Sequence, residues 1–279
     1  MNNVRPCHIL EETAGRIRAK LLTMHYQAKA NHLGGALSAV EILTYLYCRW
    51  KRPQDQFIMS KGHGASALYA TLWAVDTFTD AQMETYYQDG TKLPGHPAAG
   101  AHTAIPAATG SLGHGLPIAA GMAYAHQHVH GNDVRIACLL SDGECNEGSV
   151  WESALFAAHH RLRNLTVVID ANGFQGFGRT CDVLNLESLS RKWEAFGFAV
   201  CEIDGHDFEQ MDTAFWKDDH TVVPTAPRCV LCRTVKGRGV SFMENTMEWH
   251  YLTMTPEQYE RALAEVKARI RAKLQERAA

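Results

Sequence analysis

The sequence lacks a strong charge of either sign. Its 279 residues carry 27 basic and 30 acidic side chains, which gives a formal net charge of −3 with histidine taken as neutral. Proteins that hold nucleic acid or an anionic membrane by electrostatics carry a marked basic excess. We therefore expect neither nucleic acid nor a membrane as a partner.

Long apolar runs are also missing. No stretch reaches the roughly 20 apolar residues that a membrane-spanning helix needs, and the start of the chain lacks the basic and then apolar layout of a signal peptide. The eight cysteines are too sparse and too irregularly spaced for a disulfide scaffold. We expect a cytoplasmic protein with reduced thiols.

The sequence contains one CxxC, formed by Cys229 and Cys232 in the strand-like run RCVLCRTV. Residues three apart in a strand point to opposite faces of the sheet, so these two thiols cannot share a metal ion. We interpret both cysteines as structural.

Hydrophobic residues make up 46% of the chain, enough for a substantial buried core. Five short apolar runs alternate with amphipathic helical stretches, and these runs are residues 57–60, 135–140, 165–170, 198–204 and 228–235. Such alternation is typical of an α/β fold, a doubly wound and mainly parallel sheet with helices on both faces. We also expect helices over about 8–30 and 39–50, and a solvent-exposed final helix from about Pro256. Without a linker or an internal repeat, residues 1–279 are predicted to form a single domain.

Unusual polar residues follow the first three predicted strands, in SKGHG, SDGECNEG and DANGFQGFG. Ligands of open parallel sheets bind beyond the carboxyl ends of the strands. Asp142 and Asn172 follow neighbouring strands there, and with a backbone carbonyl near Phe174 they offer the hard oxygens that Mg²⁺ prefers. Gly143 lets the backbone approach closely, and the next helix adds oriented N–H groups for a diphosphate.

The run SDG…EG…AN resembles the thiamine diphosphate fingerprint, which usually begins Gly-Asp-Gly and ends Asn-Asn. Ser141 and Ala171 depart from that pattern, and neither departure removes a ligand atom. The resemblance implies thiamine diphosphate as cofactor, held through Mg²⁺ or through Ca²⁺ or Mn²⁺ in its place. The implied metal ligands are Asp142, Asn172 and the Phe174 carbonyl.

Four histidines lie on glycine-flanked or turn-like segments, His32 in NHLGG, His63 in SKGHG, His96 in GHP and His250 in WHY. With TGSLGHG at 109–115, their order and spacing are similar to the first domain of transketolases across nearly the whole chain. The resemblance implies that His32, His96 and His250 line the channel for a ketose donor. The other implied cofactor contacts are His63, Gly110, Ser111, Leu112, Gly143, Glu147 and again His250. The loop before His32 reads Ala30-Asn31, where the family commonly has Ser-Gly.

The resemblance further implies transfer of a two-carbon ketol unit from a ketose or ketose phosphate to an aldose. The cofactor serves as the electron sink, and neutral imidazoles move protons. In this family the carboxylate that activates the cofactor comes from a different domain. We therefore expect a C-terminal transketolase subunit with the pyrimidine-binding domain as partner, in an α2β2 assembly. The donor and the acceptor sugar stay open.

Other interpretations of the sequence are weaker. The α subunit of a 2-oxo acid dehydrogenase shares the DG…N pattern, without a reason for SKGH and GHP. A zinc hydrolase would use histidines at metal-ligand spacing, and His159-His160 are adjacent. A nicotinamide oxidoreductase would place GxGxxG after its first strand. A noncatalytic binding subunit that kept the fold is the alternative from another class.

Overall fold

The computed structural model describes residues 6–216 and 225–278. The chain forms two compact units. One comprises the described residues of Met1–Trp50, His63–His96 and Val235–Ala279, and the other comprises those of Lys51–Gly62 and Pro97–Thr234. The single domain predicted over residues 1–279 stays a prediction.

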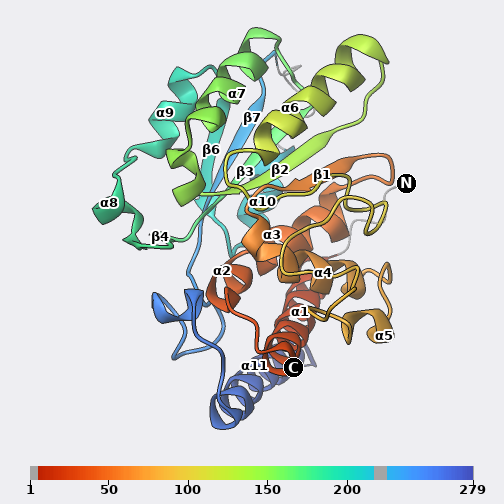
Figure 1. Ribbon diagram of the computed structural model, residues 1–279, viewed down its shortest axis with the longest axis vertical. Helices are drawn as coiled ribbons and strands as arrows, with labels where there is room; N and C mark the ends of the chain where they lie inside the picture. Colours follow the sequence, from red (N-terminus) through yellow and green to blue (C-terminus); the bar gives the residue numbers. More distant parts are fainter. Residues whose placement is uncertain (1–5, 217–224, 279) are drawn as a thin grey trace. The chain divides into compact units, whose positions relative to one another are not determined.

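The second unit is built on a five-stranded sheet in which every neighbouring pair is parallel (Figure 1). In spatial order the strands are β1 (Gln56–Met59), β2 (Ile136–Ser141), β3 (Leu165–Ala171), β7 (Arg228–Arg233) and β6 (Ala199–Asp204). The five apolar runs of the sequence are these five strands, which confirms the predicted sheet. A small antiparallel hairpin of β4 (Phe174–Gln175) and β5 (Gly178–Arg179) was not predicted.

The second unit also contains helices, several of which pack on this sheet. They are η4 (Gly143–Asn146), α6 (Gly115–Tyr124) with its continuation η3 (Ala125–Val129), α7 (Gly148–His159), α8 (Thr180–Val183), α9 (Leu189–Ala195) and α10 (Phe208–Trp216). Helices α6 and α7 lie side by side, α6 packs on β1, β2 and β3, and both α9 and α10 pack on β6. Buried residues of α6, α7 and α9 form one apolar cluster with the central strands, and this cluster includes Trp193. This packing fixes the strand ends from which the polar loops leave.

The CxxC cysteines both lie in β7 and both are buried. Cys229 belongs to the apolar cluster that α6, α7 and α9 complete. Burial raises the pKa of both thiols well above its ordinary value. These two side chains are therefore neutral members of the core.

The first unit is helical. Its elements are α1 (Cys7–Ala28), α2 (Leu33–Ser38), α3 (Val40–Tyr45), η1 (Leu46–Trp50), α4 (Ala65–Ala74), α5 (Asp80–Met83), η5 (Glu248–His250) and α11 (Pro256–Ala278), and the turn η2 (Gly62–Gly64) leads into α4. Helix α1 packs against α3, α4 and α11. Leu10, Ile17 and Leu21 of α1 are fully buried. Within the described residues, no helix combines the length and the hydropathy that crossing a bilayer requires.

The final helix α11 begins at Pro256, where the sequence predicts a helix, and it is not wholly in solvent. Ala262 and Val266 are buried, because residues four apart share one face of a helix and this face lies on α1. A Cβ atom at Gly15 of α1 would lie 2.5 Å from Ile270 Cγ1, so the glycine permits this close approach. The prediction that the final helix is exposed to solvent is therefore wrong for the face that packs on α1.

Two glycines of α6 give a matched test of the packing. A Cβ atom at Gly115 would lie 2.6 Å from the Ser60 Cα atom, whereas one at Gly121 would meet no atom within 4 Å. We expect Gly115→Ala to lower the free energy of unfolding by about 1–3 kcal/mol through overpacking. Gly121→Ala should raise it by about 0.5–1 kcal/mol through helix propensity. Urea denaturation of the chain measures both, and equal midpoints would contradict the packing.

Candidate active site

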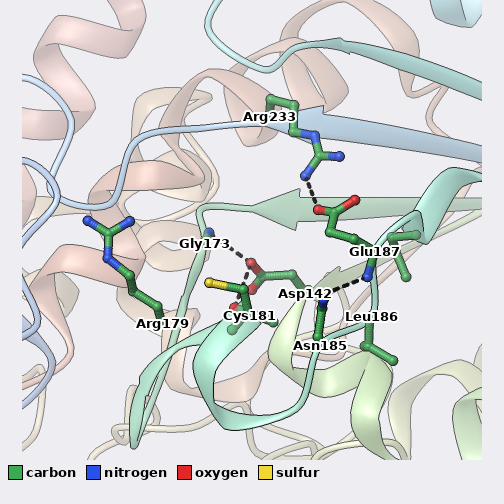
Figure 2. A pocket seen from close by; sticks show the side chains of 10 residues that line it. Asp142, Gly173, Arg179, Cys181, Asn185, Leu186, Glu187 and Arg233 are labelled. Carbon is green, nitrogen blue, oxygen red and sulfur yellow. Dashed lines mark hydrogen bonds and ion pairs between the residues drawn. The ribbon is translucent and has the colours of Figure 1, made fainter.

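Asp142 lies directly after β2, and its carboxylate is held from three sides. Oδ1 accepts a hydrogen bond from the Gly143 N–H at 2.8 Å. Oδ2 accepts one from the Gly173 N–H at 2.8 Å and one from Thr180 Oγ1 at 3.1 Å (Figure 2). Since Gly173 and Thr180 belong to the chain that leaves β3, the Asp142 side chain ties the ends of two neighbouring strands together.

Asn172 lies at the matching end of β3. The register pairs Ser141 with Asp170, so the residues that follow these two strands reach the same edge of the sheet. Asn172 Oδ1 accepts a hydrogen bond from the Phe174 N–H at 3.0 Å, which turns the chain into the β4–β5 hairpin. The structure thus brings together Asp142, Asn172 and Phe174, the residues that the sequence assigns to the metal.

The electrostatics at this edge favour a positive ligand. Burial raises the pKa of Asp142 to about 6, the charge of Asp170 acts in the same direction, and the three hydrogen bonds offset only part of the rise. Among the described residues, Asn146 Oδ1 in the same loop is a buried oxygen that has no hydrogen-bond partner. A hard cation would stabilise the Asp142 carboxylate and suits oxygen ligands of this kind. The residues present therefore fit a magnesium ion.

Glu144, which the sequence analysis did not single out, connects three segments of this unit. Its fully buried carboxylate accepts hydrogen bonds from Ser60 Oγ at 2.5 Å, from the Gly113 N–H at 2.9 Å and from the Ser141 N–H at 3.3 Å. Burial raises its pKa in spite of these donors. Glu144 therefore fixes the ends of β1 and β2 and the loop before α6 relative to one another.

The sequence assigns cofactor contacts to the three-residue loop Gly110, Ser111 and Leu112. A Cβ atom at Gly62 would lie 2.8 Å from the Gly110 nitrogen, so a side chain at Gly62 would push this loop away. At the other end, Ser149 Oγ donates to the Gly113 carbonyl at 2.8 Å. A Cβ atom at Gly113 would lie 2.7 Å from the Cβ atom of Glu147, another predicted contact. The loop is thus clamped on both sides.

A buried ion pair lies beside the Asp142 loop. Lys61 Nζ and Asp170 Oδ2 are 2.5 Å apart, and neither side chain is exposed. Thr234 Oγ1 also donates a hydrogen bond to Asp170. Because removal of one partner of such a pair leaves an uncompensated buried charge, the pair holds Lys61 against β3.

A pocket of about 160 Å³ opens on the Thr180 side of Asp142 (Figure 2). Arg179 and Arg233 both line it, and Arg233 forms ion pairs with Glu187 at 3.2 Å and with Glu202 at 2.7 Å. Of the predicted site residues, Asp142 is the one whose side chain lines this pocket. Most of the pocket is thus lined by the segment after β5, to which the sequence analysis assigns no role.

In the first unit, four histidines from separate segments form a cluster. They are His32 before α2, His63 in η2, His96 after α5 and His250 in η5. The His32 ring centroid lies 5.7 Å from that of His63, 6.3 Å from that of His96 and 4.8 Å from that of His250. The His32 N–H also donates to the His250 carbonyl at 3.0 Å. The four histidines selected from the sequence are therefore neighbours.

Lys236, which is 1% exposed, fixes one ring of this cluster. Its Nζ lies 3.2 Å from His250 Nδ1. An ammonium group can only donate, so His250 Nδ1 accepts and the proton of the neutral ring lies on Nε2. Gly34 makes room for Lys236, because a Cβ atom there would lie 3.2 Å from the Lys236 Cγ atom.

Two rings of the cluster are disfavoured as imidazolium ions. Burial lowers the pKa of His32 to about 4, and the charges of His96 and Lys236 act in the same direction. Burial also lowers the pKa of His96. Near neutral pH these imidazoles are uncharged, so each offers one N–H donor and one acceptor nitrogen to a ligand.

Residues 10–267 match the family described as "Transketolase, thiamine diphosphate binding domain". The chain belongs to the transketolase family. This finding confirms the resemblance that the DG…N pattern and the histidine loops indicated. The description of the family also names thiamine diphosphate, the cofactor that the sequence analysis expects.

Relatives of two kinds are found. The chain is 38% identical to one subunit of an apulose-4-phosphate transketolase from Phocaeicola vulgatus, over 94% of this chain and 95% of that one. It is 36% identical to a 6-deoxy-6-sulfo-D-fructose transketolase subunit of a Clostridium species, over 92% and 96%. The solved transketolase of Leishmania mexicana matches 98% of this chain with a TM-score of 0.83 at 25% identity, while the match covers 46% of that longer chain.

Sequence reasoning did not find Glu144, Lys236 or Thr180. Glu144 lies in the run SDGECNEG, in which the predicted site residues are Asp142, Gly143 and Glu147. Lys236 directly follows the last predicted strand, residues 228–235. Each acts through a partner distant in sequence, and no spacing rule indicates such a partner.

The low basicity of His32 can be tested directly on the chain. We expect its imidazole to stay neutral down to about pH 5, with a midpoint near 4, when followed by ¹H–¹⁵N NMR. The signal is assigned by its loss in His32→Gln. The folded state then binds fewer protons than the unfolded state between pH 4 and 6.5, so the free energy of unfolding falls as the pH falls through this window. A midpoint near 6.5, the ordinary value, would show that the cluster is open to water.

Proposed function

We propose that this chain is the N-terminal, diphosphate-binding subunit of a two-chain transketolase. In this proposal the enzyme transfers a two-carbon ketol unit from a ketose or ketose phosphate to an aldose. The observation that carries this proposal is the share of each relative's length that the chain matches. The match spans 95% of a relative that is named as one subunit of a transketolase, but only 46% of a transketolase whose single chain is about twice as long.

The proposal assigns the diphosphate to the edge of the sheet in the second unit. Asp142, Asn172 and the Phe174 carbonyl hold Mg²⁺, or Ca²⁺ or Mn²⁺ in its place, and their support is the buried Asp142 carboxylate with its raised pKa. The remaining proposed cofactor contacts are Gly143, Glu147, His63, His250, Gly110, Ser111 and Leu112. A single thiamine diphosphate-binding domain over residues 1–279 belongs to the same proposal, and the family match over 10–267 supports it.

Bound thiamine diphosphate supplies an electron sink for the carbanion that forms when the C2–C3 bond of the ketose breaks. The chain's own residues handle protons and position. His250 donates from Nε2, because Lys236 occupies the acceptor Nδ1. His32 and His96 are neutral, so each can accept a proton from a substrate hydroxyl or donate one to it.

A partner chain completes the proposed enzyme. We propose a C-terminal transketolase subunit that carries the pyrimidine-binding domain, an α2β2 assembly and a cytoplasmic location. The relatives named as transketolase subunits support the need for a second chain. The same names favour this function over the α subunit of a 2-oxo acid dehydrogenase and over a noncatalytic subunit.

Reconstitution tests the two-chain proposal. We expect the purified chain alone to be inactive and to gain ketol transfer when mixed with the product of a neighbouring gene that encodes a C-terminal transketolase subunit. A coupled assay with xylulose 5-phosphate or fructose 6-phosphate as donor follows the transfer. The control is the partner alone, and activity of this chain by itself, free of the host's transketolase, would contradict the proposal.

The metal ligands can be tested on the reconstituted complex by calorimetry. We expect Asp142→Ala and Asn172→Ala each to abolish Mg²⁺-dependent binding of thiamine diphosphate, since each removes a hard oxygen from a site with few protein ligands. Asp182→Ala serves as control, because Asp182 is an exposed carboxylate in the nearby α8. Undiminished cofactor affinity in either ligand variant would refute the assignment.

A further inference from the structure

His25, near the end of α1, was not among the predicted site residues, and its side chain bridges two segments of the histidine cluster. The residue is 1% exposed. One ring nitrogen, Nε2, lies 2.8 Å from Ser66 Oγ in the first turn of α4, and the other, Nδ1, lies 3.3 Å from the Ala30 carbonyl oxygen. The ring therefore has a polar partner at each end.

The directions of these two hydrogen bonds follow from the partners. Burial lowers the pKa of His25 to about 4, so the ring is neutral and carries one proton. A carbonyl oxygen only accepts, so that proton lies on Nδ1 and is donated to the Ala30 carbonyl. Nε2 then accepts from the Ser66 hydroxyl. A single tautomer satisfies both contacts.

Ala30 is held by His25 through both of its backbone groups. Lys29 adopts a left-handed conformation with φ 48°, and the Ala30 N–H returns to the His25 carbonyl at 3.1 Å. Ala30 is 2% exposed, so water does not replace the His25 ring at its carbonyl. A buried carbonyl that loses its hydrogen-bond donor is destabilising. The side chain of His25 therefore determines where the chain leaves α1.

The two ends of this bridge lie close in sequence to histidines of the cluster. His32 follows Ala30 by two residues and has a left-handed backbone of its own, φ 66°. Ser66 follows His63 by three residues. The rings of His32 and His63 have centroids 5.7 Å apart. A shift of either end of the bridge would change the distance between these two rings.

We propose that His25 is a positioning residue, which sets the place of the His32 imidazole through the Ala30 carbonyl and ties it to the segment that carries His63. The expected effect on turnover rests on the proposed function, in which His32 contacts the substrate. The effect of His25 on the position of His32 does not depend on that function, and NMR of the isolated chain can measure it.

Two substitutions separate the halves of the bridge. In His25→Asn the amide nitrogen of the asparagine is as many bonds from Cα as Nδ1 of the histidine. This variant therefore keeps the hydrogen bond donated to the Ala30 carbonyl and loses the contact with Ser66. In His25→Gln the terminal amide stands at the place of Nε2, so the Ser66 contact is kept and donation to Ala30 is lost. We expect His25→Asn to retain most of the wild-type kcat in the reconstituted enzyme. His25→Gln should lower kcat by about 10²-fold, the size of effect that a small misplacement produces, with unchanged thiamine diphosphate affinity.

A double-mutant cycle tests whether His25 acts through His32. If it does, His25→Gln should cost nothing further in a His32→Ala background. Losses that multiply would overturn the proposal. Ser66→Ala is the second probe in case His25→Gln does not fold. Like His25→Asn, it loses the Ser66 contact and keeps donation from the ring to Ala30, so it should retain most of the wild-type kcat. A loss near 10²-fold in Ser66→Ala would overturn the Ala30 carbonyl as the link between His25 and His32.

NMR of the chain alone tests the positioning role of His25 separately from the proposed transketolase function. In His25→Gln we expect the His32 imidazole signals to move and its titration midpoint to rise toward 6.5, while in His25→Asn both stay as in the wild type. Unmoved His32 signals in His25→Gln would overturn the positioning role even if the reconstituted enzyme is active. If the wild-type chain with its partner is inactive but the NMR changes occur as expected, the proposed function is overturned and the positioning role of His25 stands.

Discussion

The three hydrogen bonds that converge on the buried carboxylate of Glu144 are the interaction on which the candidate site of the second unit depends. They join Ser60 after β1, Ser141 at the end of β2 and Gly113 in the loop before α6. A buried carboxylate that lost one of these donors would be left unsatisfied, which is costly inside a protein. These hydrogen bonds therefore hold the ends of β1 and β2 and the loop that carries Gly110 to Leu112 in one arrangement.

The polar residues of the two units differ in charge. At the edge of the sheet, Asp142 and Asp170 place two carboxylates close together, and Lys61 compensates the second of them. In the helical unit, burial keeps His32 and His96 neutral. A charged edge suits a metal with its diphosphate, whereas neutral rings suit hydroxyl groups. The division agrees with the roles proposed for the two sets of residues.

The sequence was informative where periodicity or glycine determines structure. The apolar runs of β1, β2, β3 and β7 reflect burial, because a strand buried on both faces needs continuous apolar residues. The polar loops that follow β1, β2 and β3 were located from this pattern. The β4–β5 hairpin was missed because two-residue strands leave no periodic signal. Glu144 and Lys236 were missed because no spacing rule connects them with their partners in other segments. The buried face of α11 was missed because Ala262 and Val266 each lie beside a charged residue in the sequence.

The raised pKa of Asp142 links the metal to the stability of the fold. A carboxyl group whose folded pKa is about 6 binds a proton more tightly in the folded state than in the unfolded state, so its contribution to stability is present below pH 4 and is lost as the pH rises through 6. At neutral pH the ionised, buried Asp142 therefore opposes folding. A cation at this position removes that opposition, so metal binding and folding favour each other most strongly above pH 6. Without a metal, the hydrogen bonds from Gly173 and Thr180 hold the Asp142 carboxylate in place, because both donors belong to the segment that follows β3.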